Sequence, residues 1–170
     1  MSMVFQFRML SDESNVFLRD YEVMYDMTLL EFCDFICKDM KYDPMSMYSF
    51  FTADARWEKI QEFTSEDMHN EDNEDGPIPM NKVMLGQLIH NNHDRLIFTF
   101  DMFADRSYFL ELTGAKEAEK EFEYPRVAFA HGEPSDQFDP EMNFEEMSIF
   151  DEVMSDFDEF DGDDSYDDEY

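Results

Sequence analysis

The sequence predicts an α+β protein: a mostly antiparallel sheet of six to seven strands with two helices on one face, followed by an acidic C-terminal tail. Three observations predict this fold class. Segments of alternating apolar and polar residues occur in pairs joined by short polar turns, as in hairpins. Two segments with helical periodicity separate the pairs. Basic residues stop at Arg126, so the sequence divides into a domain at 1–132 and a tail at 133–170.

The first hairpin is predicted at residues 3–10 and 16–23, on either side of the turn SDESN. In its first strand, Phe5, Phe7 and Met9 occupy alternate positions, which places them on one face of the sheet. This face is expected to be the buried one.

The first helix is predicted within residues 27–44. Thr28 and Glu31 have the spacing of a capping box at its start, and Pro44 predicts its end. Its apolar face, at helical spacing, consists of Leu29, Phe32, Cys33, Ile36, Cys37 and Met40. The two cysteines are expected to be core residues rather than metal ligands, because the companion ligands of a Cys-rich site are missing.

A second hairpin and a short helix are predicted next. Strands at 45–52 and 57–64 flank the turn ADAR, and an acidic surface loop with one Gly and two Pro occupies 65–79. The helix is predicted at 81–92, with Asn81 as its cap.

The last part of the domain is predicted to be a third hairpin and one further strand. Residues 95–103 and 107–113 are apolar strands joined by the turn ADR, and 126–132 forms the final strand. The domain is expected to end near Gly132.

The charge is high and unevenly distributed. The formal net charge is −31, from 43 acidic and 12 basic residues; residues 133–170 hold 17 acids and no Lys or Arg, which leaves −14 in residues 1–132. Nucleic acids and anionic membranes are therefore not expected partners, whereas a basic protein surface is. The N-terminus lacks the features of a signal peptide and no apolar run reaches about 18 residues, so the sequence predicts a cytoplasmic protein.

The tail combines its acids with seven aromatic residues. Its apolar residues recur every three or four positions, at Phe144, Met147, Phe150, Met154, Phe157 and Phe160. Such a segment can fold into the groove of a partner. Alternatively, residues 141–157 pack onto the domain while 161–170 only keep the chain solvated. The sequence leaves both interpretations open.

Three stretches of the sequence, residues 7–54, 56–112 and 124–139, are informative when read together; the last reads YPRVAFAHGEPSDQFD. In order and spacing they resemble the plasmid pRiA ORF-three-like family, also described as mobile-element passenger proteins of the TnpR type. The resemblance covers about residues 3–140. It implies a fold more than a function, because the family has no established biochemical activity.

The family's Tyr-Asp-Phe-Gly-Asp-like motif falls on the strand placed around residues 96–105, and residues 98–106 of this sequence read FTFDMFADR. The glycine is absent, and Asp101 and Asp105 keep the acidic character. With Glu111 on the next strand, these carboxylates could hold a divalent metal, as in hydrolases and nucleases. The simpler interpretation is an ion pair with Arg106 that caps the hairpin.

His90 and His93 lie at the end of the second predicted helix, beside Asp94. A metal site needs three or four converging ligands, so favourable contact with the negative end of the helix dipole is the simpler interpretation. The sequence also lacks a phosphate-binding glycine loop and the common hydrolase motifs. No cofactor and no metal site are predicted.

These observations favour a non-enzymatic cytoplasmic binding or accessory protein, associated with a mobile element by analogy with the family. Its acidic tail would contact a basic protein. Two alternatives remain from the sequence: a DNA mimic whose acidic face competes with phosphates, and a metal-dependent hydrolase or nuclease using Asp101, Asp105 and Glu111. The oligomeric state is open.

Overall fold

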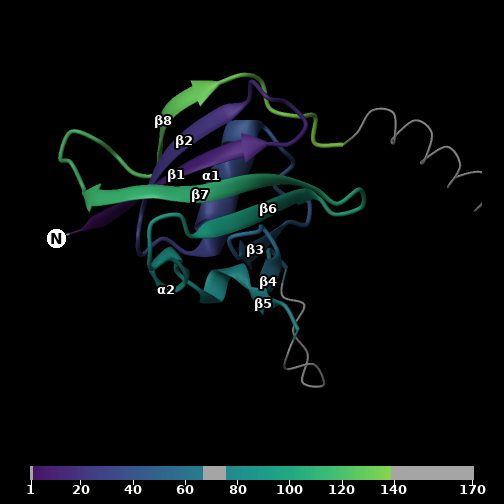
Figure 1. Ribbon diagram of the computed structural model, residues 1–170, viewed down its shortest axis with the longest axis horizontal. Helices are drawn as coiled ribbons and strands as arrows, with labels where there is room; N and C mark the ends of the chain where they lie inside the picture. The colour runs from purple at the N-terminus through teal and green to yellow at the C-terminus, as the bar shows by residue number, and fades with distance from the viewer. Residues whose placement is uncertain (1, 67–75, 139–170) are drawn as a thin grey trace, which may run out of the picture. The chain divides into compact units, whose positions relative to one another are not determined.

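The computed structural model describes residues 2–66 and 76–138, which form an eight-stranded sheet with helical elements (Figure 1). The strands are β1 (Met3–Ser11), β2 (Leu18–Met24), β3 (Ser49–Ala53), β4 (Lys59–Thr64), β5 (Ile78–Pro79), β6 (Arg95–Asp101), β7 (Arg106–Glu117) and β8 (Arg126–His131). The helical elements are α1 (Leu29–Met40), the 3-10 turn η1 (Met80–Lys82) and α2 (Leu85–Leu88).

The strand order is β5-β4-β3-β6-β7-β1-β2-β8. Every neighbouring pair is antiparallel except β4 and β5. The predicted α+β class with a mostly antiparallel sheet is therefore confirmed. The strand beyond the expected six to seven is β5, whose two residues fall in the predicted loop 65–79 and are too few to show an alternating pattern. Residues 67–75 of that loop lie outside the described residues.

Helix α1 forms for the local reasons that its sequence indicates. The Thr28 side chain accepts a hydrogen bond from the Glu31 backbone N–H at 3.1 Å, and the Glu31 carboxylate accepts one from the Thr28 N–H at 2.9 Å, which confirms the capping box. The helix ends at Met40, before the predicted stop at Pro44. Lys41 takes a left-handed conformation (φ 64°), and its N–H donates to helix carbonyls, as in αL C-caps.

Replacing Thr28 with alanine is expected to lower the free energy of unfolding by about 1 kcal/mol, because the first turn of α1 loses a side-chain acceptor. Urea unfolding followed by far-UV circular dichroism measures this loss. Thr28→Ser keeps the hydroxyl and should retain most of the stability. Equal losses in the two variants would show that the cap contributes nothing.

The second predicted helix is much shorter than expected. It consists of η1 and the single turn α2, and Asn81 is not its cap, contrary to the prediction. Met84 precedes α2 instead, and its N–H donates to the Gln87 side chain at 2.8 Å. The N–H of Leu85 donates to the Met27 carbonyl at 2.9 Å, so α2 lies against the start of α1. None of the described helices is long and apolar enough to cross a membrane.

One face of the sheet packs against α1, which lies behind the strands in Figure 1. The fully buried Phe32 of α1 contacts Phe7 of β1 and Phe50 of β3, with ring centroids 5.5 and 5.6 Å apart. Cys33 and Cys37 are buried free thiols in this core, which confirms their predicted place. The hydrogen bond with Cys37 and burial both raise the pKa of the Cys33 thiol.

The opposite side of the sheet is called the outer face here. It carries the residues that alternate with the core positions, such as Arg8 between Phe7 and Met9. The antiparallel register aligns Arg8 with Asp20 of β2 and with Glu111 of β7, so these side chains share the outer face. Antiparallel sheets commonly keep one face towards solvent in this way.

Candidate functional site

Residues 133–137, which follow β8, are fastened to the domain by three tyrosines and one arginine. Tyr42 follows α1, Tyr48 precedes β3, and Tyr108 and Arg106 lie on β7. We call Tyr42, Tyr48, Tyr108 and Arg106, together with residues 133–137 that they hold, the C-terminal anchor. The compact unit therefore runs to Gln137, five residues beyond the expected end at 132.

A closed ring of hydrogen bonds holds Ser135. The Tyr42 hydroxyl donates to the Ser135 carbonyl at 2.7 Å, and the Ser135 N–H donates to the Tyr108 hydroxyl oxygen at 2.9 Å. The two hydroxyls lie 2.7 Å apart. Because the single hydroxyl proton of Tyr42 is donated to the Ser135 carbonyl, the Tyr108 hydroxyl must donate to Tyr42. Burial raises the pKa of Tyr42, which keeps this hydroxyl protonated and able to donate.

Gln137 makes a second attachment. Its side-chain oxygen accepts from the Asp43 N–H at 2.7 Å, and its side-chain nitrogen donates to the Tyr48 hydroxyl oxygen at 2.8 Å. The Tyr48 hydroxyl in turn donates to the Asp43 carbonyl. The Gln137 amide thus uses both its acceptor and a donor, which fixes its orientation.

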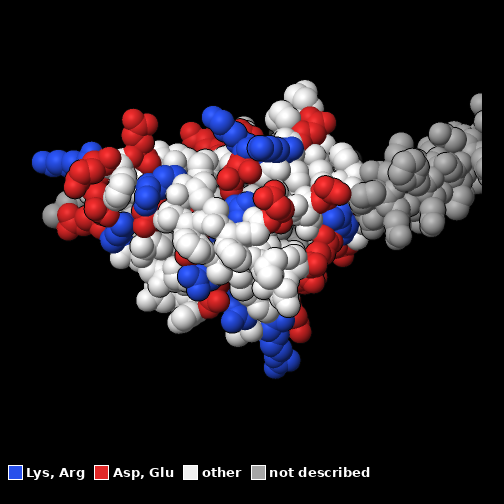
Figure 2. Space-filling view, turned by 90° about the horizontal axis from the view of Figure 1, so that it is seen from above, with Lys and Arg blue, Asp and Glu red and all other residues white. Residues whose placement is uncertain are grey.

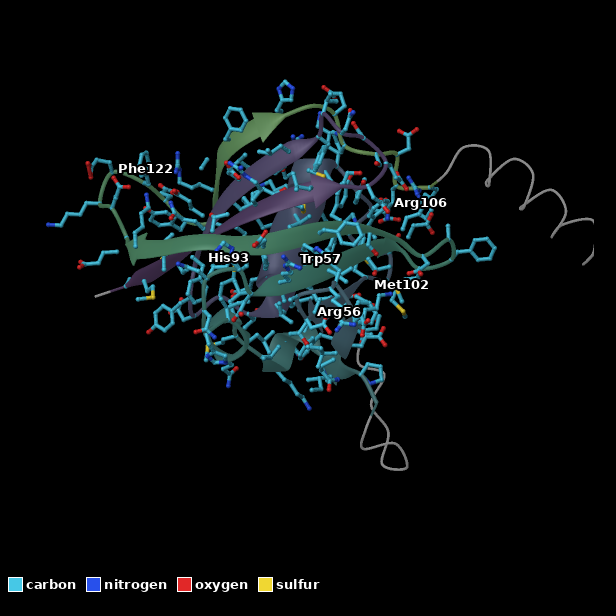
Figure 3. All side chains as sticks on the ribbon, viewed as in Figure 1. Arg56, Trp57, His93, Met102, Arg106 and Phe122 are labelled. Carbon is cyan, nitrogen blue, oxygen red and sulfur yellow. The ribbon has the colours of Figure 1, made fainter. Side chains whose placement is uncertain are left out.

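Arg106 completes the anchor, and all five of its N–H donors are used. It forms a two-pronged ion pair with Glu13 at 2.7 and 2.9 Å and donates to Asp101 at 3.1 Å. Its remaining donors reach the carbonyls of Asp136 at 2.9 Å and Gln137 at 3.1 Å. Figure 3 shows Arg106 beside the segment that follows β8. The guanidinium therefore ties the hairpin of β6 and β7 to the chain that leaves the domain.

The structure does not bring together the three carboxylates of the predicted cluster. Asp101 is 5% exposed and bound to Arg106, so the predicted ion pair is observed. Asp105 is exposed in the turn, 3.5 Å from Lys59. Glu111 lies five residues along β7 from Arg106, a separation of roughly 17 Å at strand spacing. Within residues 2–66 and 76–138, no group of three His, Cys, Asp or Glu side chains is placed to hold a metal.

Charged side chains on the outer face mostly pair across strands. Arg8 of β1 binds Asp20 of β2 through two hydrogen bonds of 2.9 and 3.0 Å. Glu22 accepts from Gln6 and forms ion pairs with Arg126 and Lys116. Figure 2 shows basic and acidic side chains intermingled on the side seen from above. These cross-strand pairs neutralise one another locally, while the domain as a whole keeps its net negative charge.

His93 is placed by backbone geometry rather than by a helix dipole. It has a positive φ of 75°, and its Nδ1 lies 2.7 Å from a carboxylate oxygen of Glu111. The neighbouring Asp94 carboxylate accepts from the backbone N–H groups of His90 and Asn91, at 2.8 and 3.0 Å. The predicted contact with the end of a helix is therefore wrong for His93, which lies five residues beyond the end of α2 at Leu88 and pairs with Glu111.

The apolar tail residues of the proposed partner-binding set fall outside the described residues. They are Phe144, Met147, Phe150, Met154, Phe157 and Phe160. Sequence reasoning missed the C-terminal anchor, although one signal was available. The resemblance over residues 124–139 continued past the expected end of the domain at 132.

Comparison with known families agrees with the fold. The family model described as "Plasmid pRiA4b ORF-3-like protein" matches residues 4–161, nearly the whole chain. The chain belongs to this family. The pRiA4b ORF-3-like match continues for 23 residues beyond Phe138, so it includes the six apolar positions of the tail.

A solved structure supports the fold of this pRiA4b ORF-3-like chain. The crystal structure of a protein of unknown function, MM3350 from Methanosarcina mazei Go1, matches with a TM-score of 0.62 and 14% identity. The match covers 76% of this chain and 70% of that one. At this identity the likeness concerns the fold alone. A search of curated proteins gives no match.

Proposed function

We propose that this pRiA4b ORF-3-like chain is a binding protein rather than an enzyme, and that its acidic C-terminal segment captures a basic surface of another protein. The observation that carries the proposal is the C-terminal anchor. In this anchor the hydroxyls of Tyr42, Tyr48 and Tyr108 and two of the five N–H groups of Arg106 hold residues 135–137, just before the acidic segment. A segment that only keeps the chain solvated would not require the residues before it to be held in one fixed position.

The composition of the segment supports a basic partner. Of the 17 acids in residues 133–170, Glu133 and Asp136 lie in the anchor region, so 15 remain in residues 139–170, without any Lys or Arg. A charge of −15 within 32 residues attracts cationic surfaces and accelerates their association.

The family match adds a second reason. A purely solvating tail needs only charge, but the matched residues 4–161 include apolar positions at helical spacing from Phe144 to Phe160. An amphipathic segment of this kind suits an apolar groove flanked by basic residues. The link to a mobile element rests on the plasmid in the family's name and is part of the proposal only.

Affinity capture with variants of the full chain tests the proposal. The full chain is expected to capture a basic protein that a chain ending at Phe138 does not. The cut at Phe138 keeps the anchor, so the shorter chain should still fold. The double variant Phe150→Ala/Phe157→Ala should also lose the partner, since two anchoring rings are removed.

Phe103→Ala is the matched control, because Phe103 is 77% exposed in the turn between β6 and β7. It should capture the partner as well as the unmodified chain. If capture resists Phe150→Ala/Phe157→Ala but is displaced by duplex DNA and by salt, the chain acts as a DNA mimic instead. Identical proteins captured by the full chain and by the chain ending at Phe138 would refute a role for the segment.

A further inference from the structure

The turn between β3 and β4 places a tryptophan in a backbone conformation that suits glycine. Asp54 organises the turn, since its carboxylate accepts from the N–H groups of Arg56 at 2.8 Å and Glu58 at 3.0 Å. Trp57 then has a φ of +65°. Turns of this kind usually carry glycine at the left-handed position, and a bulky side chain there is an outlier. Such strain is concentrated at functional sites.

The unusual conformation lays the indole on the outer face of the sheet. The Trp57 ring meets Phe109 of β7 edge-on, with centroids 5.4 Å apart. The guanidinium of Arg95, on β6, stacks over the same ring at 4.6 Å. Figure 3 shows Trp57 in front of the sheet, on the side away from α1. Arg56, Trp57, Arg95 and Phe109 are called the Trp57 patch below.

The arginines of this patch differ from the others in the chain. Among the described residues, four of the six arginines bind carboxylates, namely Arg8, Arg19, Arg106 and Arg126. Arg56 and Arg95 form no direct ion pair with a carboxylate of residues 2–66 and 76–138, although acids outnumber bases by 43 to 12 in the whole chain. The charge of Arg95 acts on Asp54 only at longer range, where it helps to lower the pKa of that carboxyl after the backbone hydrogen bonds from Glu58 and Arg56. Both arginines lie at Trp57.

The surroundings of Arg95 explain how it stays unpaired. Glu111 is its neighbour in the sheet register, but the Glu111 carboxylate binds His93 instead. One terminal nitrogen of Arg95 donates to the Ala55 carbonyl, and the buried Nε has no partner among the described residues. Arg95 is therefore held in place by stacking and one hydrogen bond, with binding capacity left over.

We propose that the Trp57 patch binds a short acidic peptide segment. A carboxylate of the peptide pairs with Arg95 and Arg56, and an adjacent aromatic or apolar side chain lies against Trp57 and Phe109. Arginine and carboxylate form strong two-pronged pairs, and the half-buried rings supply apolar contact. Nucleic acid fits less well, because a long polyanion is repelled by the net charge of −31. A short peptide interacts mainly with charges within one Debye length, about 8 Å at physiological salt.

Intrinsic fluorescence tests the proposal directly, because Trp57 is the single tryptophan of the chain. The full chain is titrated with a blocked octapeptide of alternating Asp and Phe, and with a matched octapeptide of alternating Asn and Phe. The Asp–Phe peptide is expected to change the emission saturably. The Asn–Phe peptide should bind at least about tenfold more weakly, the loss expected when charged hydrogen bonds disappear.

Variants distinguish binding at the Trp57 patch from a general attraction of the acidic peptide to positive charges on the sheet. Arg56→Gln and Arg95→Gln should each weaken the Asp–Phe peptide about fivefold or more. Arg8→Gln removes the same charge from the same face but leaves the patch intact, so its affinity should not change. Far-UV circular dichroism confirms that each variant is folded.

Three results of these titrations would overturn the proposal, and a fourth comes from a competing ligand. The three are no saturable emission change with the Asp–Phe peptide, equal binding of the Asn–Phe peptide, and equal weakening by Arg8→Gln and Arg56→Gln. Tighter binding of a single-stranded oligonucleotide than of the peptide would also overturn it, in favour of a nucleic-acid surface.

Discussion

Replacing Arg106 with methionine is expected to destabilise the domain by about 3–5 kcal/mol, the range found when one member of a buried ion pair is removed. Asp101, 5% exposed, would keep its charge without the cation that now faces it at 3.1 Å. The carbonyls of Asp136 and Gln137 would lose their donors. The C-terminal anchor should therefore weaken together with the whole domain.

Urea unfolding measures the effect, with Arg8→Met as the matched control. Arg8 also forms a two-pronged ion pair, but its side chain and that of Asp20 are 49% and 27% exposed. Its loss should cost about 0–1 kcal/mol. The double variant Arg106→Met/Asp101→Asn should recover part of the stability, because no buried charge remains. Equal losses for Arg106→Met and Arg8→Met would contradict the assigned role.

Arg106→Met should also change how the free energy of unfolding depends on pH in the acidic range. The hydrogen bond from Arg106 holds the pKa of Glu13 below its ordinary value of 4.5. A carboxyl whose pKa is lower in the folded state stabilises the fold above its unfolded pKa, and this contribution is lost as the pH falls through the folded pKa. Unfolding free energies measured from pH 7 downwards should therefore fall less steeply below pH 4.5 in Arg106→Met than in the unmodified chain.

Replacing Phe32 with alanine is expected to lower the free energy of unfolding by about 3–5 kcal/mol, the usual cost of deleting a buried ring. Phe32 has no exposed surface, and it packs between Phe7 and Phe50 at the contact of α1 with the sheet. The rings of the two strands cannot move together to fill the cavity, because both belong to the hydrogen-bonded sheet.

Urea unfolding of Phe32→Ala and Phe103→Ala, side by side, checks this expectation. Phe103 is 77% exposed, so its replacement should change stability by about 0.5 kcal/mol or less. Phe32→Leu keeps most of the volume and should lose less than Phe32→Ala. A small loss for Phe32→Ala would mean that α1 does not depend on this contact.

The elements that formed as predicted depend on neighbours in the sequence. A capping box needs only Thr28 and Glu31, three positions apart, and the helical face from Leu29 to Met40 is a local periodicity. The second helix failed for the opposite reason. Its apolar residues pack into the core, and this packing ends the helix after the single turn of α2.

The candidate sites were only partly predictable. The ion pair of Asp101 with Arg106 joins residues five positions apart across a hairpin, and the sequence suggested it. The ring of hydrogen bonds in the anchor joins Tyr42, Tyr108 and Ser135. Tyr42 and Tyr108 are 66 positions apart in the sequence, and Tyr108 and Ser135 are 27 positions apart. No periodicity indicates such a meeting, because strand order decides which distant side chains become neighbours.

Four properties could be predicted from the order of the residues alone: the fold class, the capped helix α1, the buried cysteines and the concentration of acids after residue 132. These properties follow from local propensity, alternation and composition, which need no knowledge of the topology. The end of the compact unit became visible only in the tertiary structure, as did the position of Arg56 and Arg95 beside Trp57 without an ion pair among the described residues. Both depend on hydrogen bonds and stacking between segments that are distant in the sequence, and such contacts exist only once the sheet has assembled.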